Sequence, residues 1–90
     1  MPFARPAAET PREAHVRQAV GKAIRALRKH AELSQEGLAL QAGIGRSYMG
    51  RLERGEALPG ILVIYKFLPH LNVRFSRFAA EVERQLNALS

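Results

Sequence analysis

The sequence predicts an all-α domain of five helices, and three observations lead to that prediction. Thr10 and Ser34 each stand where a side-chain oxygen can cap the first turn of a helix. Gly43 and Gly55 stand where glycine commonly ends one. Apolar residues recur at helical spacing, and no segment alternates with a period of two over a useful length, so no sheet is expected.

The first helix is expected from residue 10 to about residue 30. Thr10 can cap it, Pro11 suits the first helical position because its missing N–H is not needed there, and Glu13 completes a capping box. The apolar residues that then recur near the helical period are Val16, Val20, Ile24 and Leu27. Residues 1–9 contain two prolines and little apolar bulk, so they are expected to form a flexible arm.

Two short helices follow. The second is capped by Ser34 and ends at Gly43, where the left-handed conformation costs glycine little. The third covers about 45–54 and stops at Gly55. Gly45 stands where Ser or Thr is the more usual cap, which weakens the start of this helix without removing it.

The fourth and fifth helices differ in where their apolar residues lie. Pro59 and Gly60 break the chain before the fourth helix, at about 61–71, which is apolar nearly all round and is therefore expected to lie within the core. Pro69 should kink or shorten it. The fifth helix, about 74–88, carries an apolar stripe made of Phe75, Phe78, Val82, Leu86 and Leu89.

The composition favours a polyanionic partner and one small domain. Ninety residues can build one modest core, and Lys plus Arg exceed Asp plus Glu by 14 to 8. The absence of cysteine excludes disulfides and thiol catalysis and suits a reducing cytoplasm. The longest apolar run, 61–65, is far too short to span a bilayer, so no membrane partner is expected.

Three sequence blocks resemble the phage-repressor and Cro-like helix-turn-helix family, also called XRE-type. The three blocks are Leu33-Ser-Gln-Glu-Gly-Leu-Ala39, Ala42-Gly-Ile44 and Leu52-Glu-Arg-Gly55. Pro59 and Leu71-Asn-Val73, later in the sequence, also match. The resemblance covers roughly residues 17–78 and implies a lambda-repressor-like DNA-binding domain, with the third helix as recognition helix; we expect the whole domain to span residues 10–90. It also implies binding of operator DNA as a dimer, usually to repress transcription.

The third helix presents one basic face, whatever the family. Positions 46, 47, 50, 51 and 54 lie along one side of a helix. They hold Arg46, Ser47, Gly50, Arg51 and Arg54. Arginine can bond guanine bidentately and serine can bond a base edge or a phosphate, so we predict that the first four contact bases and that Arg54 contacts phosphate. An ordinary solvated face is the alternative; Gly50 argues against it, since glycine inside a helix costs about 1 kcal/mol relative to alanine.

Other residues are predicted to contact phosphate or to support the third helix. Gln35 lies at the start of the second helix, where N–H groups and the helix dipole favour an anion, and the resemblance implies a phosphate contact; a plain first-turn role is the alternative. Tyr48 can bond phosphate or pack under Leu52. The resemblance also pairs Arg28 with Glu53 by a charge-assisted bond, with a further N–H of Arg28 available to phosphate.

A homodimer is expected, with the fifth helix as its candidate interface. The residues of this seam are Phe78, Val82, Leu86 and Leu89. Their spacing suits a partner helix. Packing of the same stripe on the first and fourth helices of its own chain is the alternative.

No enzyme, metal site or cofactor is expected. The run from Gly45 to Leu52 is a near miss of a phosphate-binding loop, with Arg51 in place of lysine and a helix rather than a strand before it. His15, His30 and His70 lack the spacing of zinc ligands, and the chain contains no aspartate. No catalytic constellation remains.

The sequence therefore predicts a cytoplasmic, sequence-specific repressor that binds double-stranded DNA as a homodimer at an inverted repeat. A phage-like repressor, a restriction controller and the antitoxin of a toxin–antitoxin pair all fit, the last with a toxin as protein partner. The alternative is an adaptor that keeps the fold and binds proteins instead of DNA. Arg46 and Arg51 favour DNA binding, because an adaptor has no need of an arginine-lined helix.

Overall fold

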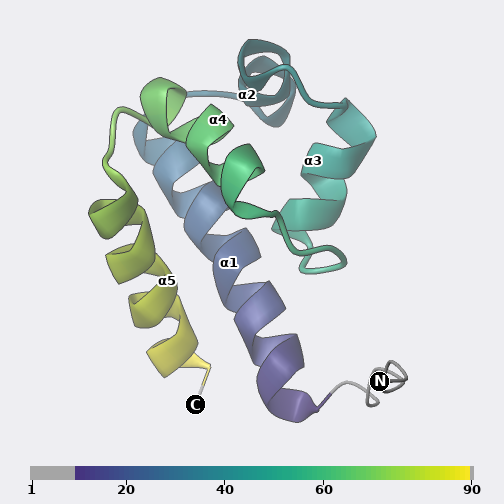
Figure 1. Cartoon of the computed structure of the whole chain (residues 1–90), viewed down its shortest axis with the longest axis vertical. Coiled ribbons are helices and arrows are strands. Elements are labelled where there is room, and N and C mark those ends of the chain that lie inside the picture. Colours follow the sequence, from purple (N-terminus) through teal and green to yellow (C-terminus); the bar gives the residue numbers. More distant parts are fainter. Residues whose placement is uncertain (1–9, 90) are drawn as a thin grey trace, which may run out of the picture.

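The computed structural model describes residues 10–89, which form five helices and no strand (Figure 1). The helices are α1 (Pro11–His30), α2 (Gln35–Ala42), α3 (Arg46–Glu53), α4 (Ile61–Leu71) and α5 (Phe75–Ala88). The predicted all-α, five-helix fold is confirmed. The arm expected at residues 1–9 lies outside the described residues.

Local signals set the helix ends. The Thr10 hydroxyl accepts the Glu13 N–H at 3.2 Å, and the Glu13 carboxylate accepts the Thr10 N–H at 3.3 Å, which closes the capping box. Ser34 caps α2 by accepting a first-turn N–H at 2.9 Å. Gly43 and Gly55, which follow α2 and α3, have φ of 71° and 74°, so both adopt the left-handed conformation that favours glycine.

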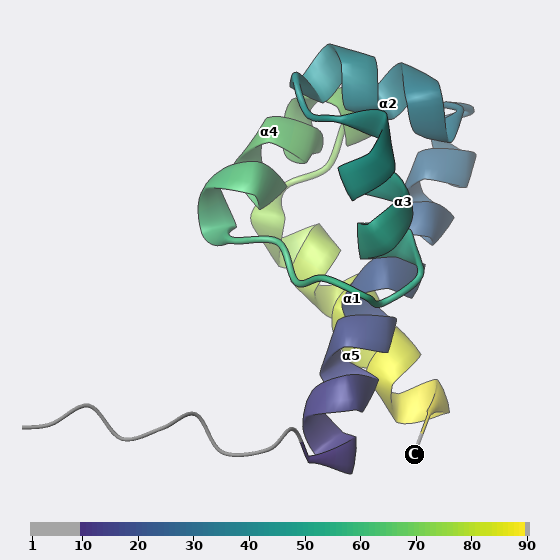
Figure 2. The ribbon, with the colours of Figure 1, turned by 90° about the vertical axis from the view of Figure 1, so that its right-hand side faces the viewer.

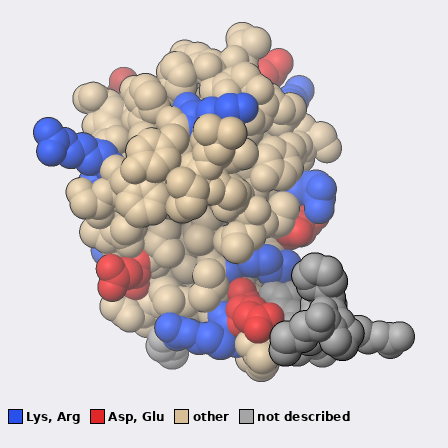
Figure 3. All heavy atoms as spheres, in the orientation of Figure 1, with Lys and Arg blue, Asp and Glu red and all other residues tan. Residues whose placement is uncertain are grey.

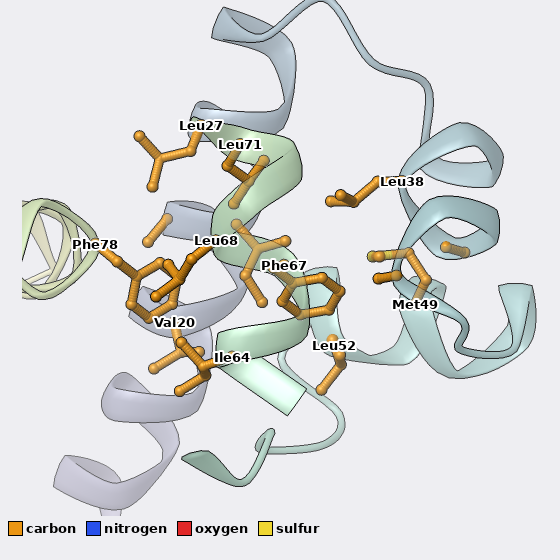
Figure 4. Close-up of a cluster of buried hydrophobic side chains, with 14 residues drawn as sticks. Val20, Leu27, Leu38, Met49, Leu52, Ile64, Phe67, Leu68, Leu71 and Phe78 are labelled. Carbon is orange, nitrogen blue, oxygen red and sulfur yellow. The ribbon is translucent and has the colours of Figure 1, made fainter. Parts of the chain in front are cut away.

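The helices surround one hydrophobic core, with α1 as the longest element (Figures 1 and 2). α1 packs along α5 and against α3, and α2 packs against α3 and α4. Figure 4 shows the side chains that meet between them: Phe67 of α4 points toward the α3 residues, and Phe78 reaches in from α5. The largest fully buried side chains are Ile24, Leu38, Met49, Leu52 and Phe67.

The prediction that α4 lies within the core is wrong for one of its faces. The inner face is buried through Ile64, Phe67, Leu68 and Leu71. The outer face leaves Ile61, Leu62 and Tyr65 more than half exposed. A small domain has a single core, and a helix that covers that core from outside can bury only one side. Pro69 does not shorten the helix, which runs on to Leu71.

The expected dimer stripe on α5 is largely used inside the monomer. Phe78 is buried in the core cluster, and Val82 packs against that cluster. Leu86 and Leu89 are half-buried. Phe78 is therefore unavailable to a partner subunit, and the alternative of intramolecular packing accounts for the beginning of the stripe.

A buried carboxylate on α5 was not foreseen. Glu81 accepts hydrogen bonds from Arg84 at 2.8 Å, from Gln85 at 3.0 Å and from Arg77 at 3.4 Å. Burial works to raise the pKa of the Glu81 carboxyl, but the bonds from Arg84 and Gln85 outweigh it and the pKa lies below its ordinary value. The sequence signal is the spacing of three and four residues between these donors and Glu81.

Within residues 10–89, no helix combines the length and the apolar character that crossing a membrane requires.

α1 and α3 approach each other closely at Gly21. A Cβ atom on Gly21 would lie 2.4 Å from the carbonyl oxygen of Leu52 and 2.8 Å from that of Glu53. Both oxygens belong to the backbone at the end of α3, so they cannot move away unless the helix moves. Gly21 therefore sets the separation of α1 and α3.

We expect Gly21→Ala to lower the free energy of unfolding by about 2 kcal/mol, because overpacking against backbone outweighs the better helix propensity of alanine. Urea denaturation followed by circular dichroism measures this change in the free energy of unfolding. Gly50→Ala is the matched control, since Gly50 also lies inside a helix and its nearest neighbour is a side-chain tip. A Gly21→Ala variant as stable as the parent would contradict the close approach.

Candidate nucleic-acid interface

α2 and α3 are joined by a short turn, and α3 lies on the outside of the molecule (Figure 2). The turn begins at Gly43 in the left-handed conformation, and α3 follows from Gly45, which caps it without a side-chain bond. Met49 and Leu52 on the inner face of α3 are fully buried. The opposite face of the helix is left for solvent or for a ligand.

A hollow of about 470 Å³ lies between the start of α2 and the outer face of α3. It is lined by Gln35, Arg46, Ser47, Gly50 and Arg54. The structure thus brings together residues that the sequence assigned to bases and residues that it assigned to phosphate. Arg51 is exposed on α3 and lies outside this lining.

Two arginines of this surface have a carboxylate beside them. Nη1 of Arg46 lies 3.7 Å from Oε2 of Glu36, and Nε of Arg54 donates to Glu56. The hydrogen bond from Arg54 lowers the pKa of the Glu56 carboxyl. Exposed ion pairs of this kind contribute little to stability, because water screens the two charges. A phosphate group can therefore replace either carboxylate at little cost.

Gly50 lies on the outer side of α3, yet it is buried beneath side chains. A Cβ atom there would lie 3.0 Å from Nη1 of Arg54 and 3.8 Å from Oε1 of Gln35. The guanidinium of Arg54 thus lies back across the bare helix backbone. Glycine keeps the hollow open and lets Arg54 lie close to the helix.

Behind this surface, an ion pair connects α1 to the end of α3. Nε of Arg28 donates to Oε2 of Glu53 at 2.6 Å, and Nη2 donates to Oε1 at 2.9 Å. Nη1 of Arg28 donates to the carbonyl oxygen of Leu33 at 2.8 Å. Such a two-pronged arrangement fixes direction as well as distance. Arg28 therefore holds both the end of α3 and the segment that leads into α2.

The same carboxylate also receives Gln35. Nε2 of Gln35 donates to Oε1 of Glu53 at 3.0 Å. This contact was not foreseen, because no local spacing joins residues 35 and 53. It links the first turn of α2 to the last turn of α3.

These contacts bear on three of the residues that the sequence assigned to phosphate. Arg28 is 9% exposed and donates three of its five N–H groups inward, which agrees with its structural role; its phosphate contact stays a prediction. Gln35 lines the hollow while its amide nitrogen donates to Glu53. Tyr48 is half-buried and packs against the core, which agrees with the packing alternative.

Comparison with known families shows to which family the chain belongs. A helix-turn-helix family model, HTH_3, matches residues 24–78, more than half of the chain. The chain belongs to the XRE-type helix-turn-helix family. The uncharacterised HTH-type transcriptional regulator YazB of Bacillus subtilis (strain 168) is 39% identical over 59 residues, which are 66% of this chain and 86% of YazB.

Solved structures of helix-turn-helix regulators share the fold. The restriction-modification controller protein C.AhdI from Aeromonas hydrophila is 34% identical with a TM-score of 0.62, over 72% of this chain and 92% of that one. The clp gene regulator ClgR from Corynebacterium glutamicum has a TM-score of 0.78 over 82% of this chain and 79% of its own, at 20% identity, and shows the fold alone. This chain is an HTH-type transcriptional regulator, and the matched residues include α2, the turn and α3.

Glu53→Ala should lower the free energy of unfolding of this helix-turn-helix regulator by about 3 kcal/mol, because it leaves Arg28 buried without its carboxylate. Thermal melting followed by circular dichroism measures the loss. Glu83→Ala, an exposed acid on α5, is the control and should melt like the parent. If Glu53→Ala and Arg28→Ala both melt at the parent temperature, the ion pair does not hold α3.

Gly50→Ala should separate recognition from stability. The tip of Arg54 can swing away from the new methyl group, so the helix should gain up to about 1 kcal/mol. The same methyl group fills the hollow and displaces Arg54, so operator DNA should bind more weakly by about 1 kcal/mol, the value of a modest base contact. Paired melting and binding measurements test this, and binding equal to that of the parent would argue against a close approach of DNA to Gly50.

Proposed function

We propose that this regulator binds double-stranded DNA sequence-specifically through α3 and represses transcription as a homodimer at an inverted-repeat operator. The observation that carries the proposal is the division of α3 into two sides. Its inner side is held by the core and by Arg28, and its outer side presents Arg46, Ser47 and Arg51 to solvent. A helix of this kind can enter the major groove with its fold unchanged.

Arg46 and Arg51 are the proposed base-reading residues. Each can donate two hydrogen bonds to the O6 and N7 atoms of guanine, and Ser47 can bond a neighbouring base edge or a phosphate. Gly50 leaves the helix backbone bare beneath Arg54, so the groove wall can approach it when Arg54 turns toward a phosphate. The backbone N–H groups at the start of α2, with Gln35 and Arg54 beside them, are the proposed phosphate contacts.

Repression follows from occupancy, because a dimer on an operator excludes other proteins from the same DNA. Among the specific roles, the likeness to the controller protein C.AhdI favours a restriction controller over a phage-like repressor or an antitoxin with a toxin partner. The place of action would be the cytoplasm, where the DNA is. Neither catalysis nor a cofactor is part of this proposal.

Arg46→Ala and Arg51→Ala should each weaken specific binding by about 1–3 kcal/mol and relax the base preference at one position of each half-site. Selection of an operator from random DNA, followed by titration of each variant, measures both effects. Arg74→Ala is the control: Arg74 is exposed at the start of α5, across the molecule from α3 (Figure 1), so its loss removes one charge without touching α3.

Two results would overturn the proposal. One is that both α3 variants bind the selected operator as tightly as the parent and with the same base preferences. The other is a chain that binds no DNA even at low salt, where phosphate contacts are strongest. The second result would support the protein-binding adaptor instead.

A further inference from the structure

The outer side of α4 and the connection before it form an exposed apolar surface. Its members are Leu58, Ile61, Leu62 and Tyr65, which are 54%, 59%, 72% and 54% exposed. We call this set the α4 face. Figure 3, in the orientation of Figure 1, shows the area over the first half of α4 free of Lys, Arg, Asp and Glu, with one basic side chain within the upper part of this side and other charges toward the edges. A contiguous apolar surface with a polar rim is the usual mark of a protein–protein contact.

We propose that the α4 face is covered by a second copy of this chain in a two-fold symmetric dimer. The first argument is electrostatic. The chain carries a net charge of +6, so most of its surface repels a second copy. α3 presents arginines, and the exposed side of α1 presents Lys22, Arg25 and Lys29. None of the four α4-face residues carries a charge. Lys66 is exposed one turn after Leu62 and is the charged neighbour of this face, so a contact through the four residues brings together fewer like charges than a contact through α1 or α3.

The second argument is symmetry. A two-fold contact brings the same surface of both protomers together, so the surface must complement itself. Apolar side chains meet this condition, since a leucine packs on a leucine, whereas a cluster of arginines does not. Tyr65 gives the face a fixed element, because its ring stacks on Phe75 of α5 with centroids 5.6 Å apart and planes 13° apart. A held aromatic ring loses little freedom when a partner covers it.

The third argument is the distance between the two α3 helices, and this step rests on the proposed operator binding. In Figure 2, α3 faces the viewer and α4 lies to its left. A two-fold axis that runs toward the viewer along the α4 face turns both α3 helices toward the same DNA. α3 packs on α1 and α2 and makes few close backbone contacts with α4, so each α3 axis lies at least one helix-packing distance plus half a helix diameter, roughly 15 Å, from the dimer plane. The two helices then lie roughly 30 Å or more apart, a range that includes the 34 Å of one DNA turn.

The α5 seam expected from the sequence does not give this spacing. α1 lies between α5 and α3 (Figure 1), and α1 packs on both. A dimer through Val82, Leu86 and Leu89 therefore adds one more helix layer on each side. The two α3 helices would then lie roughly 50 Å apart, which matches neither one turn of DNA nor two.

The test compares two leucines that are both strongly exposed. Leu62→Lys places a charge in the α4 face, and Leu40→Lys places the same charge on α2, where Leu40 is 80% exposed. Neither change touches the core, so both variants should fold, which circular dichroism checks. Sedimentation equilibrium should show a dimer for the parent and for Leu40→Lys. For Leu62→Lys the dimer dissociation constant should rise by about tenfold or more, as expected for a central interface residue.

Three outcomes would overturn the proposal. They are a parent chain that is monomeric at high micromolar concentration, a Leu62→Lys variant that dimerises like the parent, and equal losses for Leu62→Lys and Leu40→Lys. A Leu86→Lys, Leu89→Lys double variant that stays folded but alone becomes monomeric would assign the interface to α5 instead.

DNA binding separates failure of this inference from failure of the proposed function. On a duplex with a single half-site, Leu62→Lys should bind as tightly as the parent, because α3 is intact. On the full inverted repeat it should bind about tenfold more weakly or worse, because the second half-site no longer assists the first. If the Arg46 and Arg51 variants lose operator binding and Leu62→Lys does not, the proposal that α3 recognises DNA is supported. The assignment of the dimer interface to the α4 face is then wrong.

Discussion

The hydrogen-bonded ion pair between Arg28 and Glu53 is the contact on which the placement of α3, the proposed recognition helix, depends. α3 has eight residues and is too short to be a stable helix alone, so its position must come from tertiary contacts. A buried ion pair adds little net stability, because removing both charges from water offsets most of their attraction. Its contribution here is direction: Glu53 also accepts from Gln35, and Arg28 also donates to Leu33, so α1, α2 and α3 are tied at one point.

This arrangement separates support from recognition within one short helix. Met49 and Leu52 face the core, and the backbone at the end of α3 rests against Gly21. Arg46 and Arg51, in contrast, are exposed, and no core contact depends on them. Side chains on the outer face can therefore change without loss of the fold. A scaffold built this way can present different base-reading residues from the same backbone, and Gly50 is tolerated because the helix is held from behind.

Most of the fold could be predicted from the sequence because its boundaries depend on local chemistry. The capping box at Thr10 and the glycine at Gly43 act within a few residues, so their spacing alone is informative. The outer side of α4 was missed because most of its residues are apolar, although Lys66 stands on the exposed side and the buried residues 64, 67, 68 and 71 follow helical spacing. The contact of Gln35 with Glu53 depends on how two helices pack, which no local pattern records. Arg28 and Glu53 were paired through the family resemblance rather than through their spacing.

The part of α4 that the sequence placed wrongly is also the part that gives the proposed dimer its geometry. The chain passes from α3 to α4 through residues 54–60, and this connection is held on the protein surface: Gly55 and Pro59 are buried, and a Cβ atom on Gly55 would lie 3.1 Å from Cα of Gln18 in α1. A connection fixed in this way transmits the position of one helix to the other. In the proposed dimer, the α4 face sets the spacing and direction of the two α3 helices, and the side chains of α3 set which bases are read. The length of an operator and its sequence are then controlled by different residues, so either can change while the other is kept.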